Sequence, residues 1–222
     1  MHSSGDEEQE ELETRIEDSK ARVRAQLGLE VPVEPFANSV RVLVLQHPQE
    51  PDKELGTASL LVRALGKAEL RVGLSWKSLK HLVGSEVVPG TWAVLYLGPK
   101  GKEYSQPVNF VNNKGEPVAV TANIQGLVVL DGTWSQAKAL WWRNSWLTKL
   151  KRVVLKPAGP SLYGRLRKEP RAEALSTIES TALALSKIDP KGAELQRHLE
   201  GAFARMLEEF KARKRASPAA KP

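Results

Sequence analysis

The chain has 222 residues, 41% of them hydrophobic, which is enough to bury the core of one domain of ordinary to large size. It contains no cysteine, which excludes disulfides, thiolate nucleophiles, Cys-ligated zinc and iron–sulfur clusters, and its four histidines are not spaced as metal ligands. No stretch approaches the roughly 20 apolar residues of a membrane span, and the acidic N-terminus is unlike a signal peptide. We therefore expect a cytoplasmic protein that uses no metal and no membrane.

The net charge of +7 is unevenly distributed along the chain. Residues 1–30 hold nine Asp or Glu and four Lys or Arg, whereas residues 138–171 hold ten Lys or Arg and one Glu. Trp141, Trp142 and Trp146 lie within this basic segment. Cations interleaved with aromatic side chains are typical of a surface that binds phosphates and stacks on bases. The alternative is a solvated face that only confers solubility.

The first half of the chain predicts alternating helices and strands. An amphipathic helix is predicted over 6–27, followed by an extended, proline-containing linker over 30–38. The apolar, β-branched run 40–46 predicts the first core strand, which ends at His47. The further predicted elements are helices over 57–65 (capped by Thr57 and stopped by Gly66) and 78–83, and strands over 70–74 and 92–97.

The second half is organised around an apolar run over 127–130 that ends at Asp131. Helix-favouring residues follow from Ser135 onwards. The pattern therefore predicts a buried strand that ends in a turn with a carboxylate at its start. Ligands of open α/β sheets bind outside the carboxyl ends of strands, which places Asp131, Thr133 and Trp134 where a site is expected. The alternative is an ordinary turn in which Thr133 only caps the next helix.

The remaining elements complete an α/β pattern with a mostly parallel sheet. Ser176 or Thr177 is predicted to cap a helix that runs to about residue 186, with Glu179 as the capping-box partner. The other predicted elements are a polar excursion over 108–126, a strand over 151–155, a polar loop over 161–170 and a long helix over 191–213. The glycines at 98 and 101 do not fit a phosphate-loop spacing, and no dinucleotide-binding fingerprint occurs.

Three groups of motifs occur in the order of a known family. The chain resembles the DTW-domain family in these motifs: LQHP at 45–48 with GTASLL at 56–61, LDGTW at 130–134, and EALSTIESTALAL at 173–185 after a basic YGRLRKEP loop. Its hallmark is Asp-x-Thr-Trp followed further along by a Leu-Ser-Thr-x-Glu-Ala-like helix start. The resemblance divides the chain into an acidic helix and linker (1–39), a DTW domain (40–210) and a basic disordered tail (211–222). Many relatives carry a cysteine cluster before the first strand, which this chain lacks.

The resemblance implies a SPOUT-like α/β domain, with a C-terminal knot and helices on both faces of the sheet, that binds S-adenosylmethionine. It also implies transfer of the 3-amino-3-carboxypropyl group to N3 of a uridine in tRNA, with release of methylthioadenosine. A related family with an Asp-x-Ser-Trp element acts on ribosomal RNA. The alternatives are the same transfer onto rRNA, an RNA methyltransferase, and an RNA-binding module without catalysis.

The resemblance also indicates which residues form the site. Asp131 is the expected catalytic residue, either as the base that removes the N3 proton or as the group that orients the uridine. His47 is expected to be structural, and Ser176 and Thr177 have helix capping as their alternative role. The residues expected to bind S-adenosylmethionine are Leu97, Gly98, Pro99, Thr133, Trp134, Leu175, Ser176 and Thr177. Those expected to bind RNA are Lys138, Arg143, Tyr163, Arg165, Arg167 and Lys168.

Overall fold

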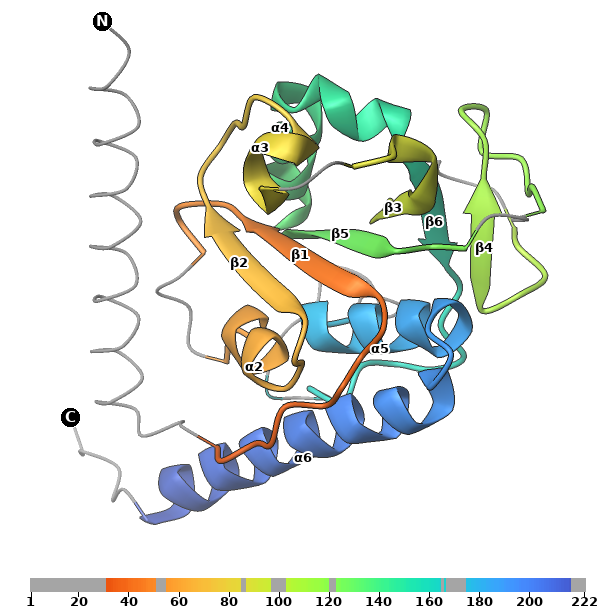
Figure 1. Cartoon of the computed structure of the whole chain (residues 1–222). Coiled ribbons are helices and arrows are strands. Elements are labelled where there is room, and N and C mark those ends of the chain that lie inside the picture. The colour runs from red at the N-terminus through yellow and green to blue at the C-terminus, as the bar shows by residue number, and fades with distance from the viewer. Residues whose placement is uncertain are drawn as a thin grey trace, which may run out of the picture.

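The computed structural model describes residues 31–50, 55–84, 87–96, 103–119, 123–164, 166 and 175–216. These residues form a sheet between two groups of helices, with α3 and α4 on one face and α2, α5 and α6 on the other (Figure 1). The elements in chain order are β1 (Arg41–Gln46), α2 (Ala58–Arg63), β2 (Ala68–Val72), α3 (Leu79–Val83), η1 (Pro89–Thr91), β3 (Trp92–Leu95), β4 (Val108–Val111), β5 (Gly126–Asp131), α4 (Trp134–Arg143), η2 (Ser145–Lys149), β6 (Lys151–Leu155), α5 (Thr177–Ile188) and α6 (Gly192–Ala216). The predicted helix over 6–27 lies outside the described residues.

Within the described residues the strand order is β2-β1-β5-β3-β6-β4. Every neighbouring pair is parallel except β4 and β6, which are antiparallel. The two central strands, β1 and β5, pair along their whole length, from Arg41 beside Gly126 to Gln46 beside Asp131. This arrangement confirms the predicted α/β class, the mostly parallel sheet and the helices on both faces.

The sheet separates two hydrophobic cores, because alternate residues of a strand point to opposite faces. Val42 and Val44 of β1 pack into the core beneath α2, α5 and α6. Leu43 and Leu45 pack into the second core, beneath α3, α4 and η2. The predicted apolar face of the last helix is confirmed: all six of its residues are buried in the first core, namely Leu195, Leu199, Phe203, Met206, Leu207 and Phe210.

Two predictions about the secondary structure are wrong. The predicted polar excursion over 108–126 contains the strand β4, which pairs with the sheet edge at β6 through Val108–Leu155 and Phe110–Val153. The tail predicted to be disordered from 211 continues as helix α6 to Ala216. In addition, the strand predicted over 70–74 lies at Ala68–Val72, two residues earlier.

The segment before β1 has no regular secondary structure over 31–35, as predicted, but it packs against the domain. Val31 is 1% exposed, and Asn38 donates to the carbonyl of Lys67 at 3.1 Å. Asp189, at the end of α5, accepts the amide of Val40 at 2.9 Å. These contacts fix the start of β1 and so set the register of the central strand. In the described part of the chain, no helix combines the length and apolar character needed to cross a membrane.

Candidate active site

The carboxyl ends of β1 and β5 lie side by side at the centre of the sheet. From β1 the chain passes through α2 to β2 on one side, and from β5 it passes through α4 to β6 on the other side. The helices α2 and α4 cover opposite faces (Figure 1). The chain therefore diverges at this point, which is where doubly wound sheets bind their ligands. Gln46 and Asp131, the last residues of β1 and β5, are direct neighbours here.

Asp131 is held by contacts from three residues in two segments, the end of β1 and the start of α5. Its side chain is buried, and Oδ2 accepts a hydrogen bond from Gln46 Nε2 at 2.7 Å. Oδ1 accepts a hydrogen bond from the hydroxyl of Thr177, the first residue of α5. The Asp131 carbonyl accepts the amide of His47 at 3.0 Å. The carboxylate is therefore fixed in one orientation, and each of its oxygens keeps a lone pair for a further donor.

Gln46 brings a second polar group to the same place. The amide must turn Nε2 towards the Asp131 carboxylate, because two facing oxygens would repel each other. Its Oε1 atom is then a buried acceptor with no hydrogen-bond partner in the described part of the chain. Such an orphaned acceptor costs about 1–3 kcal/mol unless a donor reaches it. The site therefore combines a carboxylate with an amide oxygen that lacks a donor.

The turn after Asp131 depends on Gly132. Its φ of +153° disfavours other residues, and a Cβ placed there would lie 2.8 Å from Cβ of Gln136. Thr133 is the N-cap of α4, and its hydroxyl accepts the Gln136 amide at 3.3 Å in a capping box. This geometry confirms the predicted strand, turn and helix start, and it places Trp134 in the first turn of α4.

The start of α5 is fixed in the same way and confirms the predicted capping box. Ser176 Oγ accepts the Glu179 amide at 3.3 Å, and Glu179 Oε2 accepts the Ser176 amide at 2.8 Å. The Ile178 amide donates to Thr57 Oγ1 at 3.2 Å, so Thr57 serves α5 and makes no side-chain cap on α2. Because protein groups already bond these amides, Ser176 acts as a helix cap, whereas Thr177 reaches Asp131.

The structure brings together some of the predicted site residues and separates others. Thr177 contacts Asp131, Trp134 and Leu175 are half-buried on the flanking segments, and Thr133 is exposed. Six residues lie outside the described part of the chain: Leu97, Gly98, Pro99, Arg165, Arg167 and Lys168. Gln46 was not predicted, although the LQHP motif contains it, because the sequence does not show which strand lies beside β5.

The prediction that Tyr163 contacts RNA is wrong. Tyr163 is 1% exposed, its hydroxyl donates to the Leu55 carbonyl at 2.5 Å, and its ring packs edge-on against Phe203 with centroids 4.9 Å apart. Tyr163 therefore joins the loop before α5 to the core. Lys138 and Arg143, on α4, are exposed as an RNA contact requires.

The fold and the site define a doubly wound α/β domain with a buried carboxylate at the position where sheets of this kind bind ligands. The chain belongs to the DTW domain family, which matches residues 28–211. This match confirms the resemblance seen in the motifs.

Curated relatives carry one activity in their names. The chain is 32% identical over 161 residues to tRNA-uridine aminocarboxypropyltransferase 2 of Macaca fascicularis, covering 72% of this chain and 51% of the relative. It is 30% identical over 163 residues to the Drosophila melanogaster protein of that name, covering 72% and 61%. It is 25% identical over 207 residues to tRNA-uridine aminocarboxypropyltransferase A of Arabidopsis thaliana, covering 80% and 73%. The chain spans about half the length of the primate relative. No solved structure matches it.

Proposed function

We propose that the chain transfers the 3-amino-3-carboxypropyl group of S-adenosylmethionine to N3 of a uridine in tRNA. The names of its relatives support the reaction and the tRNA substrate. The observation that carries the proposal for this chain is the buried Asp131, held by Gln46 and Thr177 where β1 and β5 diverge. In the Asp-Gly-Thr-Trp motif, Asp131 therefore supplies one carboxylate that is held in a defined orientation.

The reaction requires a proton acceptor at the uridine. N3 carries a proton at neutral pH, and it must lose this proton as it attacks the carbon next to the sulfonium. The new N–C bond forms as the C–S bond breaks, and the C–S electron pair remains on the sulfur of the departing methylthioadenosine. Asp131 accepts the N3 proton, a form of general-base help worth about 10²–10⁴ in rate. Gln46 and Thr177 orient the carboxylate for this step.

The groups at the site fit the transferred part of S-adenosylmethionine. The amino end of that group is an ammonium, which needs acceptors, and the site offers Asp131 together with the unpartnered Gln46 Oε1. We assign Thr133, Trp134, Leu175 and Thr177 to the binding of this substrate, with the predicted loop of Leu97, Gly98 and Pro99. Orientation selects the aminocarboxypropyl carbon, since all three substituents of the sulfonium are electrophilic.

RNA binding is assigned to the basic segment. Lys138 and Arg143 are exposed on the helix that begins at the Asp131 turn. We propose that they contact phosphates together with Arg165, Arg167 and Lys168 of the polar loop predicted over 161–170. Replacing Arg165 and Arg167 by Ala removes two phosphate contacts, so log affinity should depend less steeply on log salt, by about 1.4–1.8 in slope. An unchanged slope would remove both residues from the footprint.

We also propose the SPOUT-like knot that the resemblance implies. The supporting observation is that α5, which follows the outlying strand β6, returns to the centre of the domain, where Thr177 meets Asp131 and Ile178 meets Thr57. A crystal structure that traces the chain from 155 to 175 tests this point. A connection that passes through no loop would contradict the knot without affecting the assignment of Asp131.

The by-product of the reaction tests the proposed function. The purified chain is incubated with S-adenosylmethionine and either tRNA or rRNA, and the nucleosides released from the cofactor are separated by chromatography. Methylthioadenosine formed only with tRNA is the expected result. S-adenosylhomocysteine would indicate a methyltransferase, methylthioadenosine with rRNA alone would change the substrate, and no turnover with either RNA would leave a binding module.

A further inference from the structure

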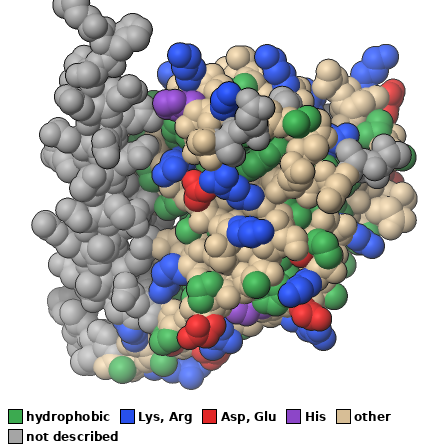
Figure 2. Space-filling model, in the orientation of Figure 1, with side chains coloured by type: hydrophobic (Ala, Val, Ile, Leu, Met, Phe, Trp, Pro, Cys, Tyr) green, Lys and Arg blue, Asp and Glu red, His purple; other side chains and the backbone are tan. Residues whose placement is uncertain are grey.

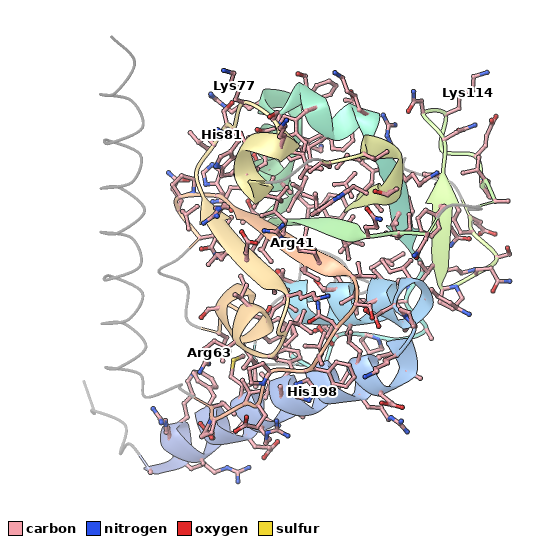
Figure 3. The ribbon with its side chains drawn as sticks, viewed as in Figure 1. Arg41, Arg63, Lys77, His81, Lys114 and His198 are labelled. Atoms are coloured by element: carbon pink, nitrogen blue, oxygen red, sulfur yellow. The ribbon has the colours of Figure 1, made fainter. Side chains whose placement is uncertain are left out.

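One face of the domain is covered by two segments that carry cations. The segments that cover it are residues 73–84, which include α3, and residues 134–155, which include α4 and η2, and neither contains Asp or Glu. We call their outer surface the α3–α4 face; its exposed charged residues are Lys77, Lys80, Lys138, Arg143 and Lys149. Lys and Arg side chains project from the upper edge of the molecule, above α3 and α4 (Figure 2), and Lys77 lies there beside His81 (Figure 3).

The opposite face has a mixed charge. Its outer helix, α6, carries six Lys or Arg and four Glu, and Lys211 pairs with Glu208 at 2.7 Å. The two segments of the α3–α4 face therefore carry charges of one sign, whereas α6 carries both signs. A surface of one sign attracts polyanions such as RNA and repels a second copy of itself.

A single tryptophan stands out of the α3–α4 face. Trp142 is 79% exposed, whereas Trp76, Trp92 and Trp146 are buried. Trp141, its neighbour in sequence, packs against Tyr96 with ring centroids 4.9 Å apart. Other tryptophans thus fill the core beneath the face. In the described structure, the Trp142 side chain does not contribute to that core.

Trp142 is carried on a rigid support. Asn144, which ends α4, is 1% exposed and donates to the carbonyls of Leu74 at 3.0 Å and Leu140 at 2.8 Å. Its Oδ1 accepts the Trp76 amide at 2.8 Å, and the indole of Trp146 donates to the Trp76 carbonyl at 3.0 Å. These bonds join the end of α4 to the segment before α3, so the Trp142 ring can receive a base with little loss of backbone entropy.

The position of Trp142 is related to that of Asp131 by the helix between them. Trp134, Lys138 and Trp142 are four residues apart, so they form one ridge that runs from the Asp131 turn along α4. Eight residues at 1.5 Å per residue place Trp142 about 12 Å from the start of this ridge. That length corresponds to about three or four stacked bases at 3.4 Å each.

We propose that the α3–α4 face binds an RNA strand that continues from the uridine at Asp131, and that Trp142 stacks on a base three or four nucleotides from the base at Trp134. The inference rests on the proposed function for the identity of that uridine, but the binding itself does not. Lys138 and Lys77 neutralise phosphates on either side of the stacked base. Base–aromatic stacking tolerates any sequence, so this contact positions the strand and does not select it.

The test measures the affinity of the full chain for fluorescent tRNA without S-adenosylmethionine, over a range of salt concentrations. Trp142→Ala should weaken binding about 5- to 150-fold and leave the salt slope unchanged, because no charge is removed. Trp142→Phe should retain much of the affinity. The matched control is Val118→Ala, at an exposed apolar residue on the β4 edge, which should bind as the wild type does.

A second pair of variants tests the charges. Lys77→Ala with Lys138→Ala should reduce the salt slope by about 1.4–1.8, whereas Arg197→Ala with Arg213→Ala on α6 should leave it unchanged. Wild-type affinity of Trp142→Ala, or equal slopes for the two pairs, would overturn the proposal. So would a mass measurement in solution that shows Trp142→Ala dissociating a dimer. If the wild type forms methylthioadenosine with tRNA but Trp142→Ala binds tRNA as tightly as the wild type, only this inference is refuted. If Trp142→Ala binds tRNA more weakly but the wild type forms no methylthioadenosine, only the proposed transferase activity is refuted.

Discussion

Glu179 allows a quantitative prediction, because one buried carboxylate joins two segments. Its Oε2 accepts hydrogen bonds from the Ser161 hydroxyl at 2.7 Å and from the Ser176 amide and hydroxyl at 2.8 and 2.6 Å. Its Oε1 accepts the Leu162 amide at 2.7 Å. These bonds tie the loop before α5 to the helix start that brings Thr177 to Asp131. Loss of the carboxylate therefore affects both stability and the site.

The cost of Glu179→Ala follows from what happens to each donor. The hydroxyls of Ser161 and Ser176 can rotate to other acceptors, so they contribute little. The buried Ser176 amide loses its acceptor, which costs about 1–3 kcal/mol, and the partly buried Leu162 amide adds about 1 kcal/mol. We therefore expect the free energy of unfolding to fall by about 2–4 kcal/mol. Glu179→Gln keeps one acceptor oxygen and should lose less.

The measurement is urea denaturation followed by circular dichroism. Glu34→Ala is the matched control, because Glu34 is exposed, and we expect its free energy of unfolding to stay within about 0.5 kcal/mol of the wild type. The same free energy of unfolding for Glu179→Ala and Glu34→Ala would refute the account of how the loop is joined to α5. A loss in Glu179→Ala with wild-type transfer activity would refute the link to the site.

Three further substitutions have expected outcomes. Gln46→Leu removes the donor to Asp131 together with an unpartnered acceptor, so we expect a free energy of unfolding within about 1 kcal/mol of the wild type. The rate constant of transfer in single-turnover assays should fall about 10- to 100-fold. An unchanged rate constant would exclude a positioning role for Gln46. Gly132→Ala should lower the free energy of unfolding by about 2 kcal/mol through its φ and its contact with Gln136, and wild-type stability would argue against the turn geometry. The Arg152 guanidinium lies 5.1 and 5.2 Å from the ring centroids of Tyr96 and Trp141. Arg152→Met should therefore lower the free energy of unfolding by about 1–2 kcal/mol and leave the salt slope of RNA binding unchanged. A flatter slope would show that Arg152 contacts a phosphate.

Local patterns in the sequence predict most of the elements that form the site. The apolar run before Asp131 and the Ser176–Glu179 capping box each depend on neighbours in the chain, and both occur as predicted. Gly132 is the residue that the tight turn after Asp131 requires. The position of the carboxylate at a strand end was therefore accessible from sequence alone.

The partners of that carboxylate were not accessible in this way. Gln46 and Thr177 lie 85 and 46 residues from Asp131. The pairing of β1 with β5 brings Gln46 to it, and the packing of α5 against the domain brings Thr177 to it. The strand β4 was missed because Val108–Val111 is short and contains Asn109, and its pairing with β6 decides its conformation. Tyr163 was assigned to RNA because it lies in a basic loop, and burial of its ring against Phe203 is a tertiary effect.

The most direct test of the central claim is mass spectrometry of nucleosides from tRNA incubated with S-adenosylmethionine and either the wild type or Asp131→Asn. Asparagine has nearly the shape of aspartate but cannot take a proton, so a loss of general-base help alone lowers the rate about 10²–10⁴-fold. We expect a uridine carrying the aminocarboxypropyl group with the wild type and at least a hundredfold less with Asp131→Asn at unchanged tRNA affinity. Equal yields from the two proteins would contradict the assignment of Asp131 as the reactive centre.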